Sequence, residues 1–554
     1  MIMSQHQIVT PTCRKHALNI DKQMGNTGWA DSMEKEHKQL VSRDTSRLVP
    51  MSKVPKGKKI IPSVWQFKYK MNKGIPTEQK SRGCGGGHRQ VAGEDYGDSY
   101  APTTRVSNVR VILAVAAEEG HLSEQADIEG AFLYPMLEGE WRNGIYYPKY
   151  EIYMKPFEGF ETYDENGELM VLLLLKALYG LVQAALLWNR TLVDFFNKYK
   201  FRQCNTDPCV FVNDHLKEGQ YLSVPVHVDD MIPTGKPQSV IDTFLDNLEG
   251  EFSIKRLGPT EWFSGILIKR KPGHIFLMQP HYSEELLRKW KMDDANPALV
   301  PMKHGEDMYA LTHDEPAAEL HNSTEVLSLA SGWGWLTECT RPDLMFTRMT
   351  MSRMAQKCSE SSWKQMKNAL RYLINTKWHG IRYSRGTEFP NVLITFVDAS
   401  LMTCKVTGRA AYCIIIFLNG GPIYWRCKLL PGKPSASVLE AEYPASHFAT
   451  NDTTYFRQYM YELGFPQTSP TIIYSDNAAT VQLNEEGRMT HLNRHINMKY
   501  HSMRWSREQK IVQYVHVPTA DNISDIGTKI LKDVAQYQRF TKILCYDCVE
   551  FNDT

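Results

Sequence analysis

Two sets of carboxylates in the sequence could each hold divalent cations. In the first, Asp229 and Asp230 follow the apolar run V-P-V-H-V, and Asp127 ends another apolar segment. Adjacent carboxylates at a strand end place hard oxygen ligands at one sheet edge, and Mg²⁺ prefers such oxygens. Two such ions can clamp the attacking and leaving oxygens of a phosphoryl transfer. Because an Asp-Asp pair alone has little specificity, this motif is only a starting point.

The chain provides its own control for that motif. Asp293 and Asp294 are also adjacent, but they follow a charged amphipathic segment rather than an apolar strand. We expect them to lie at a solvated helix end. The residues that precede the pair therefore distinguish Asp229 and Asp230 from a surface feature.

The second set of carboxylates lies in the C-terminal third, at the ends of predicted strands and helices. Its members are Asp398, Glu442, Asp476 and Asp525. Acids brought together from a strand, a helix, a strand and a helix can surround two Mg²⁺ ions, an arrangement that activates water to hydrolyse phosphodiesters. Many α/β domains have acids at strand ends, so the spacing alone has moderate specificity.

Strand and helix patterns place these acids at the ends of regular elements. The sequence predicts a strand over 223–228 that ends in Asp229, and a strand over 122–133 that leads into a helix. It predicts helices over 29–40, 108–119, 241–252, 280–291 and 437–459. From residue 391, several short strands and a long helix predict an α/β or α+β unit of about 140 residues.

Length and composition indicate a multidomain globular protein. At about 150 residues per domain, 554 residues suggest three to four domains. The formal net charge is +2, which excludes a strongly basic field over the whole protein. Eleven cysteines, an odd number along a long chain, favour a reducing intracellular compartment.

Neither a signal peptide nor a membrane span is expected. The first 24 residues lack an apolar core. The most apolar run, residues 171–188, carries Lys176, Gly180 and Gln183 and is barely long enough to span a bilayer. We expect it to form a buried strand and helix.

Residues 53–82 form a local basic stretch with nine Lys or Arg residues and a single acidic residue, Glu78. Such a stretch could neutralise nucleic-acid phosphates, and its interleaved aromatics could stack on bases. The alternative is a solvated face over a small sheet core. The lysines predicted to bind nucleic acid are Lys53, Lys56, Lys58, Lys59, Lys68, Lys70 and Lys73.

Collinear motifs resemble the reverse transcriptase of copia-type LTR retrotransposons. They include W-x-F-K-Y-K (65–70), Y-A-P-T-T-R (100–105), Q-A-D-I-E-G-A-F-L (125–133), L-Y-G-L-V-Q-A (178–184), V-H-V-D-D (226–230) and T-R-P-D (340–343). In the C-terminal unit, F-V-D-A-S, E-Y-x-A, Y-S-D-N and D-I-x-T-K resemble the ribonuclease H domain that follows in the family. The resemblance covers roughly residues 28–540.

The resemblance implies roles for the matched residues. Asp127 and Asp229 would hold metal ions with Asp230 alongside, and Lys80 and Arg82 would meet the nucleotide triphosphate. Two further matches are Phe132, under the incoming sugar, and Gln183, near the incoming nucleotide. The alternatives are a core aromatic at Phe132, a helix-surface amide at Gln183 and a solvated pair at Lys80 and Arg82. In the ribonuclease unit the metal ligands would be Asp398, Glu442, Asp476 and Asp525, with Glu442 preferred to Glu440.

The expected fold is α+β and multidomain: a right-hand polymerase with fingers, palm and thumb, followed by a ribonuclease H-like α/β domain. The expected boundaries are a leader (1–27), fingers and start of palm (28–126), palm (127–238), thumb-like unit (239–310), helical connection (311–390), ribonuclease H-like domain (391–540) and tail (541–554). Two Mg²⁺ per active site, or Mn²⁺, would be the cofactors. The implied partners are an RNA template, a DNA primer, RNA–DNA hybrid and deoxynucleoside triphosphates, in cytoplasmic virus-like particles, with no membrane partner.

Several departures from the family motifs keep two other functions open. Gly83 and Cys84 replace strand-forming residues and should weaken a fingers strand. Pro444 follows Glu442 closely and should kink or end that helix unless it lies near the start. One alternative is a catalytically decayed relic that only binds nucleic acid. The other is a protein that retains only hybrid nuclease activity.

Overall fold

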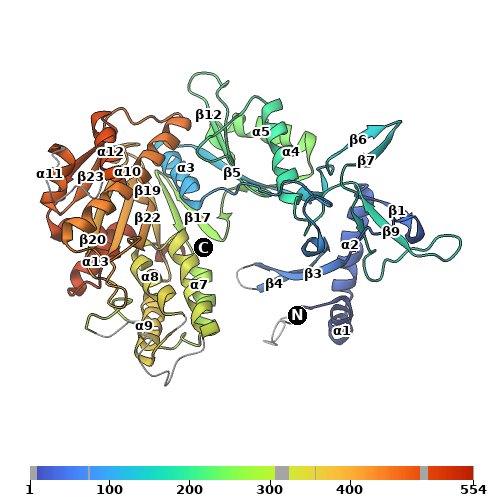
Figure 1. Ribbon diagram of the computed structural model, residues 1–554, viewed down its shortest axis with the longest axis horizontal. Helices are drawn as coiled ribbons and strands as arrows, with labels where there is room; N and C mark the ends of the chain where they lie inside the picture. Colours follow the sequence, from blue (N-terminus) through green and yellow to red (C-terminus); the bar gives the residue numbers. More distant parts are fainter. Residues whose placement is uncertain (1–8, 73–74, 306–322, 356, 487–496, 553–554) are drawn as a thin grey trace.

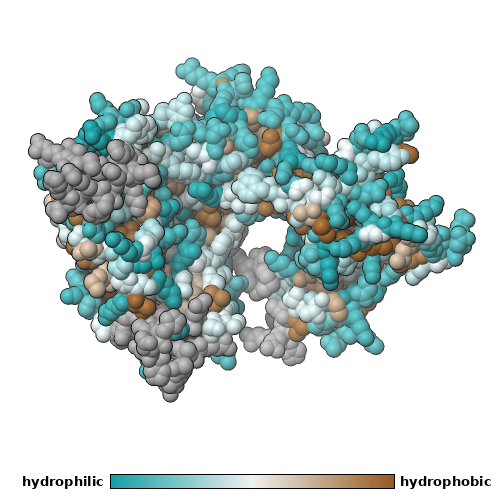
Figure 2. Space-filling view, viewed as in Figure 1, coloured by the Kyte–Doolittle hydropathy of each residue, from teal (hydrophilic) through white to brown (hydrophobic). Residues whose placement is uncertain are grey.

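The computed structural model describes residues 9–72, 75–305, 323–355, 357–486 and 497–552. It is a multidomain α+β structure, as predicted, and Figure 1 shows α1, α2, β3 and β4 on one side and α10–α13 on the other. Figure 2 shows the surface hollowed between these two sides. Lys73, one of the lysines predicted to bind nucleic acid, lies outside the described residues.

The N-terminal side, the fingers, combines two helices with short sheets. Its first sheet has the order β1-β9-β8-β2, and β3 and β4 form a separate hairpin. The elements are α1 (Arg14–Met24), α2 (Gly28–Ser42), β1 (Ser46–Pro50), β2 (Ile60–Ile61), β3 (Ser63–Asn72), β4 (Ile75–Gly85), β6 (Gly139–Arg142), β7 (Ile145–Pro148), β8 (Tyr153–Met154) and β9 (Met170–Leu174).

The alternating pattern of β3 decides which of its faces is buried. Trp65 and Phe67 are buried, and the ring of Phe67 packs at 5.4 Å against Trp29 of α2. Lys68 and Lys70 are exposed. The aromatics of the basic stretch therefore form a core under a charged face, as the alternative interpretation held, and Trp65 and Phe67 are not exposed for base stacking.

A seven-stranded antiparallel sheet, the palm sheet, lies at the centre of the chain. Its order is β10-β11-β12-β13-β5-β14, with β15 paired to β5. Helices α4 and α5 cover it with a buried aromatic cluster. The elements are α3 (Val106–Glu119), β5 (Leu122–Ile128), α4 (Ala184–Lys198), β10 (Arg202–Gln203), β11 (Val210–Val212), β12 (Tyr221–His227), β13 (Asp230–Met231), β14 (Thr234–Lys236), α5 (Gln238–Glu251) and β15 (Ile254–Pro259).

The apolar run at 171–188 is a strand followed by a helix. Its first residues belong to β9, and α4 begins at Ala184. Among the described residues, no helix combines the length and the apolar character needed to cross a bilayer.

Between the palm sheet and the C-terminal domain lies a five-stranded sheet of order β16-β17-β18-β19-β25 with four helices. The elements are β16 (Trp262–Phe263), β17 (Ile266–Lys271), β18 (His274–Met278), α6 (Pro280–Lys289), α7 (Ser323–Cys339), α8 (Met345–Met354), α9 (Glu360–Thr376), β19 (His379–Ser384) and β25 (Tyr546–Asp547). This sheet joins three expected units, because its strands come from the thumb-like unit (262–278), the helical connection (379–384) and the tail (546–547).

The expected boundaries at residues 239 and 541 do not separate independent units either. Helix α5 and strand β15, expected in a thumb-like unit from residue 239, pack on and pair with the palm sheet. The tail from residue 541 is not a loose end, since β25 pairs with β19.

The C-terminal domain has a five-stranded sheet of order β22-β21-β20-β23-β24. Its first three strands are antiparallel, while β23 pairs in parallel with both β20 and β24. The elements are β20 (Ile394–Ser400), β21 (Ala411–Leu418), β22 (Gly421–Leu429), α10 (Val438–Glu462), β23 (Thr471–Ser475), α11 (Ala478–Glu486), α12 (Asn497–Glu508), β24 (Val512–His516) and α13 (Val534–Leu544).

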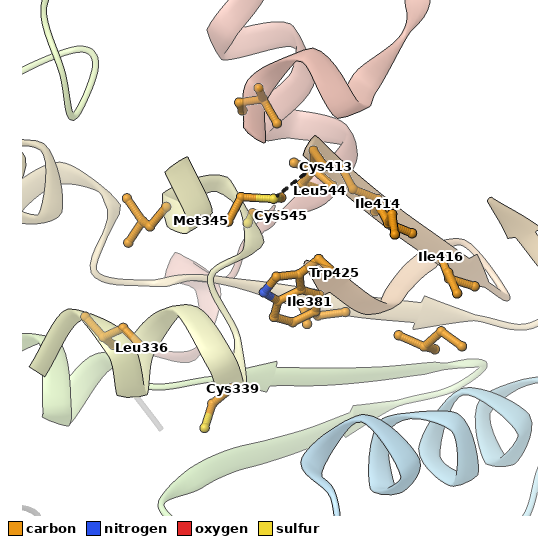
Figure 3. Close-up of a cluster of buried hydrophobic side chains, with 14 of the residues drawn as sticks. Leu336, Cys339, Met345, Ile381, Cys413, Ile414, Ile416, Trp425, Leu544 and Cys545 are labelled. Atoms are coloured by element: carbon orange, nitrogen blue, oxygen red, sulfur yellow. Dashed lines mark hydrogen bonds between the residues drawn. The ribbon is translucent and has the colours of Figure 1, made fainter. Parts of the chain in front are cut away.

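One apolar core extends from α3 through the connection into this domain. Figure 3 shows part of it, where the thiol of Cys413 on β21 lies 3.3 Å from the sulfur of Met345 in the connection. All eleven cysteines are free. Cys545 and Cys548 have a C-x-x-C spacing, but their side chains belong to two different apolar clusters.

Candidate active sites

A hairpin turn and a neighbouring strand bring the first carboxylates together. Asp230 on β13 lies directly opposite Asp127 on β5, and Asp229 occupies the turn between β12 and β13. The indole of Trp188 donates to the carbonyl of Val228 at 2.6 Å, and the Ile128 N–H donates to the carbonyl of Asp229 at 3.1 Å. The first bond holds the turn against α4, and the second holds it against β5.

Val228 has an unusual backbone conformation in this turn. Its φ is 61°, a left-handed value that a β-branched residue rarely adopts. Strain of this kind costs about 1–3 kcal/mol and persists where the surroundings impose it. The palm sheet therefore fixes the turn that carries Asp229.

The side chains of Asp127 and Asp229 line a cavity between the palm sheet and the fingers hairpin. Lys80 and Arg82 of β4 line the same cavity, as do Lys255 of β15 and four residues of α2. The Arg82 guanidinium lies 4.8 Å from the ring centroid of Tyr179, another lining residue. Cations from the fingers and carboxylates from the palm thus share one cavity.

Burial and charge crowding raise the pKa of two acids in this group, Asp127 and Asp230. Burial and the neighbouring Asp229 raise the pKa of Asp127, although Lys255 opposes the shift. Burial, Asp229 and Asp127 raise the pKa of Asp230 to about 6. Burial, Arg82 and Lys70 lower the pKa of Lys80. Acids that repel one another favour a bound cation.

Two predicted nucleotide contacts lie outside the lining of this cavity. Phe132 is half-buried, and its ring packs edge-on at 5.1 Å against Tyr179, which does line it. Gln183 is buried, accepts from Gln90 at 3.0 Å and donates to the carbonyl of Asp95 at 3.4 Å. The helix-surface alternative for Gln183 is wrong, and its contact with a nucleotide stays a prediction.

The predicted lysines fall into two groups. Lys68 and Lys70 lie on the exposed face of β3, where Lys70 pairs with Glu78 and also lines the cavity. Lys53, Lys56 and Lys59 are exposed near β2. Lys58 is half-buried and forms an ion pair with Asp95 at 3.5 Å.

The glycine run after Arg82 does not disrupt the fingers. Strand β4 continues through Gly83 and Cys84, which pair with Trp65 and Val64. A Cβ on Gly83 would lie 2.8 Å from the ring of Phe157. The expected weakening of this strand is not seen, because Gly83 makes room for a packed aromatic ring.

Three carboxylates of the second set lie together in the C-terminal domain. Single oxygens of Asp398 on β20, Glu442 on α10 and Asp476 after β23 all lie within 4.8 Å of one another. Asp525 of the short helix Ile523–Gly527 is buried beside them and interacts electrostatically with Asp398. The structure thus brings all four predicted acids into one group.

Helix capping distinguishes Glu442 from Glu440. Ser437 caps α10 by accepting from the Glu440 N–H at 3.2 Å, and the Glu440 carboxylate accepts from the Ala436 N–H at 2.9 Å. Glu440 is therefore a capping residue. Pro444 lies in the second turn, and α10 continues to Glu462, so the proline does not end the helix.

This acidic group fits a divalent cation. Oε2 of Glu442 is buried without a hydrogen-bond partner. Burial and the acids Asp398 and Asp476 raise the pKa of Glu442 to about 9. Burial and the acids Asp525 and Asp476 raise the pKa of Asp398 to about 7. Buried acids with an unpartnered oxygen are the donor set that a hard cation would satisfy.

Three residues support these acids: Thr528 and Lys529 belong to the D-I-x-T-K motif, and Asn522 lies just before it. Thr528 donates to Asp398, and Lys529 pairs with Asp525 at 2.8 Å. The Asn522 amide donates to Asp476 at 3.1 Å and to the carbonyl of Val397 at 3.2 Å. The D-I-G-T-K motif was the signal that could have identified Thr528 and Lys529.

The fold and the two acidic groups define a polymerase palm joined to a ribonuclease H-like domain. A family model described as reverse transcriptase (RNA-dependent DNA polymerase) matches residues 45–304. Over nearly its whole length the chain is similar to the reverse transcriptase and ribonuclease H region of Pol proteins from copia-type retrotransposons.

Curated relatives extend the similarity beyond the family model. The chain is 28% identical over 509 residues to the retrovirus-related Pol polyprotein from transposon TNT 1-94 of Nicotiana tabacum, covering 90% of this chain and 36% of the relative. It is 29% identical over 513 residues to the polyprotein from transposon RE1 of Arabidopsis thaliana, covering 92% and 33%. The chain thus spans about a third of the length of these relatives.

Solved structures give weaker likenesses. A foamy viral protease-reverse transcriptase in complex with double-stranded DNA aligns with a TM-score of 0.49 and 12% identity, covering 89% of this chain and 70% of that one. LC11-RNase H1 in complex with RNA/DNA hybrid aligns with a TM-score of 0.19 and 15% identity, covering 24% and 93%.

Proposed function

We propose that the chain is an RNA-directed DNA polymerase with a ribonuclease H activity that cleaves RNA in RNA–DNA hybrids. The observation that carries this proposal is the presence of two acidic groups on two different sheets. Asp127 and Asp229 share a cavity with Lys80 and Arg82, and Asp398, Glu442 and Asp476 converge in the C-terminal domain. The match to a reverse transcriptase family model supports the same assignment.

In the polymerase site, Asp127 and Asp229 would hold two Mg²⁺ ions, with Mn²⁺ as a substitute. Bound there, the ions would favour deprotonation of the primer hydroxyl and neutralise charge on the transferring phosphate. Lys80 and Arg82 would donate to the triphosphate of a deoxynucleotide. Asp230 would lie alongside the two ligands rather than hold a metal ion itself.

Substrate selection would depend on Phe132 and Gln183. The half-buried ring of Phe132, fixed against Tyr179, would exclude a ribose 2′-hydroxyl. Gln183 would act near the nucleotide through the loop that it holds at Gln90 and Asp95. The exposed lysines of β3 would contact the phosphates of an RNA template and a DNA primer in a salt-dependent manner.

In the ribonuclease site, Asp398, Glu442, Asp476 and Asp525 would hold the Mg²⁺ ions. Asn522 and Thr528 would keep Asp476 and Asp398 oriented, and Lys529 would balance the charge of Asp525. Location in cytoplasmic virus-like particles belongs to the same proposal and rests on the family resemblance.

Primer extension on poly(rA)–oligo(dT) with Mg²⁺ tests the polymerase assignment, with the wild type compared with Asp229→Asn. We expect extension that is lost in the variant. A wild type that binds hybrid without extending it would contradict the assignment. A hybrid-cleavage assay would then separate the nuclease-only protein from the binding relic.

A further inference from the structure

Helix α2 lines the proposed nucleotide cavity although it precedes the residues that the family model matches. That match begins at residue 45, whereas Ser32, Lys35, Glu36 and Gln39 of α2 all line the cavity. The helix is anchored at its start by Asp21 of α1, whose carboxylate accepts from the N–H groups of Trp29 and Ala30 at 3.1 and 2.9 Å. A firmly anchored helix therefore contributes to a wall of the cavity.

One side of α2 covers the free edge of strand β4. β3 occupies the other edge, which leaves alternate N–H groups of β4 without a strand partner. Ser32 accepts from the Ser81 N–H at 2.7 Å, and Glu36 accepts from the Gly83 N–H at 3.2 Å. Ser32 and Glu36 are one helical turn apart and replace a missing strand. Lys80 and Arg82 alternate with the two bonded residues along β4.

The C-terminal end of α2 holds the palm. The guanidinium of Arg43, at the C-cap, donates to the carbonyls of Glu129 and Gly130 at 2.9 and 3.4 Å. It also lies 4.3 Å from the ring centroid of Tyr134. The bonded carbonyls belong to the turn that follows Asp127 and precedes Phe132.

We propose that α2 fixes the two walls of the nucleotide cavity relative to each other, with Arg43 as the positioning residue. Glu36 and Ser32 set the fingers wall that carries Lys80, and Arg43 sets the palm wall that carries Asp127. This inference rests on the proposed polymerase function. It assigns to α2 control over nucleotide affinity and sugar selection, although α2 donates none of the proposed metal ligands.

Arg43 is suited to this role by its chemistry. A planar guanidinium can donate to two carbonyls and stack on an aromatic ring at the same time, which a lysine ammonium cannot do. Its own carbonyl is held by Lys176 at 2.7 Å, so the anchor is tied to the fingers as well. A displacement of about 1 Å in reacting groups can cost on the order of a hundredfold in rate.

Steady-state primer extension with Arg43→Met and Arg43→Lys tests the proposal. For Arg43→Met we expect kcat/KM for a deoxynucleotide to fall by about tenfold to a hundredfold. We also expect the preference for deoxynucleotides over ribonucleotides to fall, because Phe132 follows the released turn. Arg43→Lys should retain part of the kcat/KM and part of the preference for deoxynucleotides, since lysine keeps the positive charge. Lys38→Met is the matched control, because Lys38 is exposed on the same helix and pairs with the exposed Glu34 at 3.2 Å.

Amide hydrogen exchange without substrate provides a second measurement. In Arg43→Met, residues 128–133 should exchange faster than in the wild type, whereas Lys38→Met should leave them unchanged. Unchanged exchange there, or a lower Tm with unaltered kcat/KM and sugar preference, would overturn the positioning role. If the wild type extends no primer, the proposed function fails, and the exchange measurement still decides whether Arg43 holds the turn.

Discussion

The guanidinium carbon of Arg110 lies 3.9 Å from the ring centroid of Trp425, which joins helix α3 to strand β22 of the C-terminal domain. Arg110 is buried and donates to the carbonyls of Ile423, Glu338 and Cys339 at 2.8, 2.6 and 2.8 Å. One side chain therefore links three parts of the chain inside a shared core.

This link predicts that the polymerase and ribonuclease parts unfold together. Replacing Arg110 with Met leaves buried carbonyls without donors and should cost about 3–5 kcal/mol. Differential scanning calorimetry should show one transition at a lower Tm. Arg348→Met is the control, because Arg348 is partly exposed and pairs with Glu338 at 2.9 Å. Its loss should cost at most about 1 kcal/mol. Two separate transitions in the wild type would contradict the shared core.

The core also shows what could be foreseen from the sequence. The helix over 108–119 was predicted, and its residues are apolar nearly all around, a pattern typical of a helix buried on every side. That pattern indicated burial but not the neighbours of the helix. Contact of α3 with β19 and β22, more than 250 residues away, depends on tertiary packing that local patterns do not encode.

For the candidate sites too, some features could be predicted from the sequence and others could not. The acids at strand ends were predictable, because strand alternation and the residues before each acid placed them on sheet edges. The choice of Asp127 and Glu442 as partners depended on the family motifs, and the structure brings both residues to the expected groups. The bonds of Gln183 to the 90–95 loop were not predictable, since they depend on a turn that brings distant residues together.

Two separate acidic groups predict separable activities. Asp229→Asn should abolish primer extension and leave hybrid cleavage near the wild-type rate, because Asp229 lies on the palm sheet. Asp476→Asn should do the reverse, because the Asp476 carboxylate belongs to the C-terminal group. Both rates can be measured on one hybrid labelled on each strand. Equal loss of both activities in either variant would rule out two independent sites.

The ring at position 132 predicts sugar selection. Phe132→Ala should admit ribonucleotides, since the ring that packs against Tyr179 would no longer meet a 2′-hydroxyl. We expect the ratio of kcat/KM for deoxynucleotide to that for ribonucleotide to fall by about tenfold or more, equivalent to about 1.4 kcal/mol. Phe132→Tyr keeps the ring and should keep the ratio. An unchanged ratio in the alanine variant would leave Phe132 as a core aromatic.

Residues 83–87 (G-C-G-G-G) form a glycine-rich segment, and we predict that packing requires the glycine at position 87. A Cβ at this position would lie 2.0 Å from the carbonyl oxygen of Gly180, a backbone atom that cannot rotate away. Gly87→Ala should therefore destabilise the fold by about 2–3 kcal/mol. Gly250→Ala is the control, because nothing lies within 4 Å of a Cβ there. Within α5, that change should stabilise the protein by about 0.5–1 kcal/mol. Denaturant unfolding measures the change in unfolding free energy for both variants. An unchanged unfolding free energy in Gly87→Ala would indicate that packing does not require glycine at this position.

His121 predicts a loss of stability in mild acid. Burial, assisted by Lys236 and Arg270, lowers the pKa of His121 to about 3, and its ring stacks on Tyr221 at 4.5 Å. The unfolded chain binds this proton below about pH 6.5. The folded chain does not, so stability is full above pH 6.5 and falls as pH drops towards 3. The slope from this one group is about 1.4 kcal/mol per pH unit between those limits.

His121→Phe keeps a stacked ring and should flatten the dependence of unfolding free energy on pH by that amount. An equally steep slope in His121→Phe would place the acid sensitivity elsewhere.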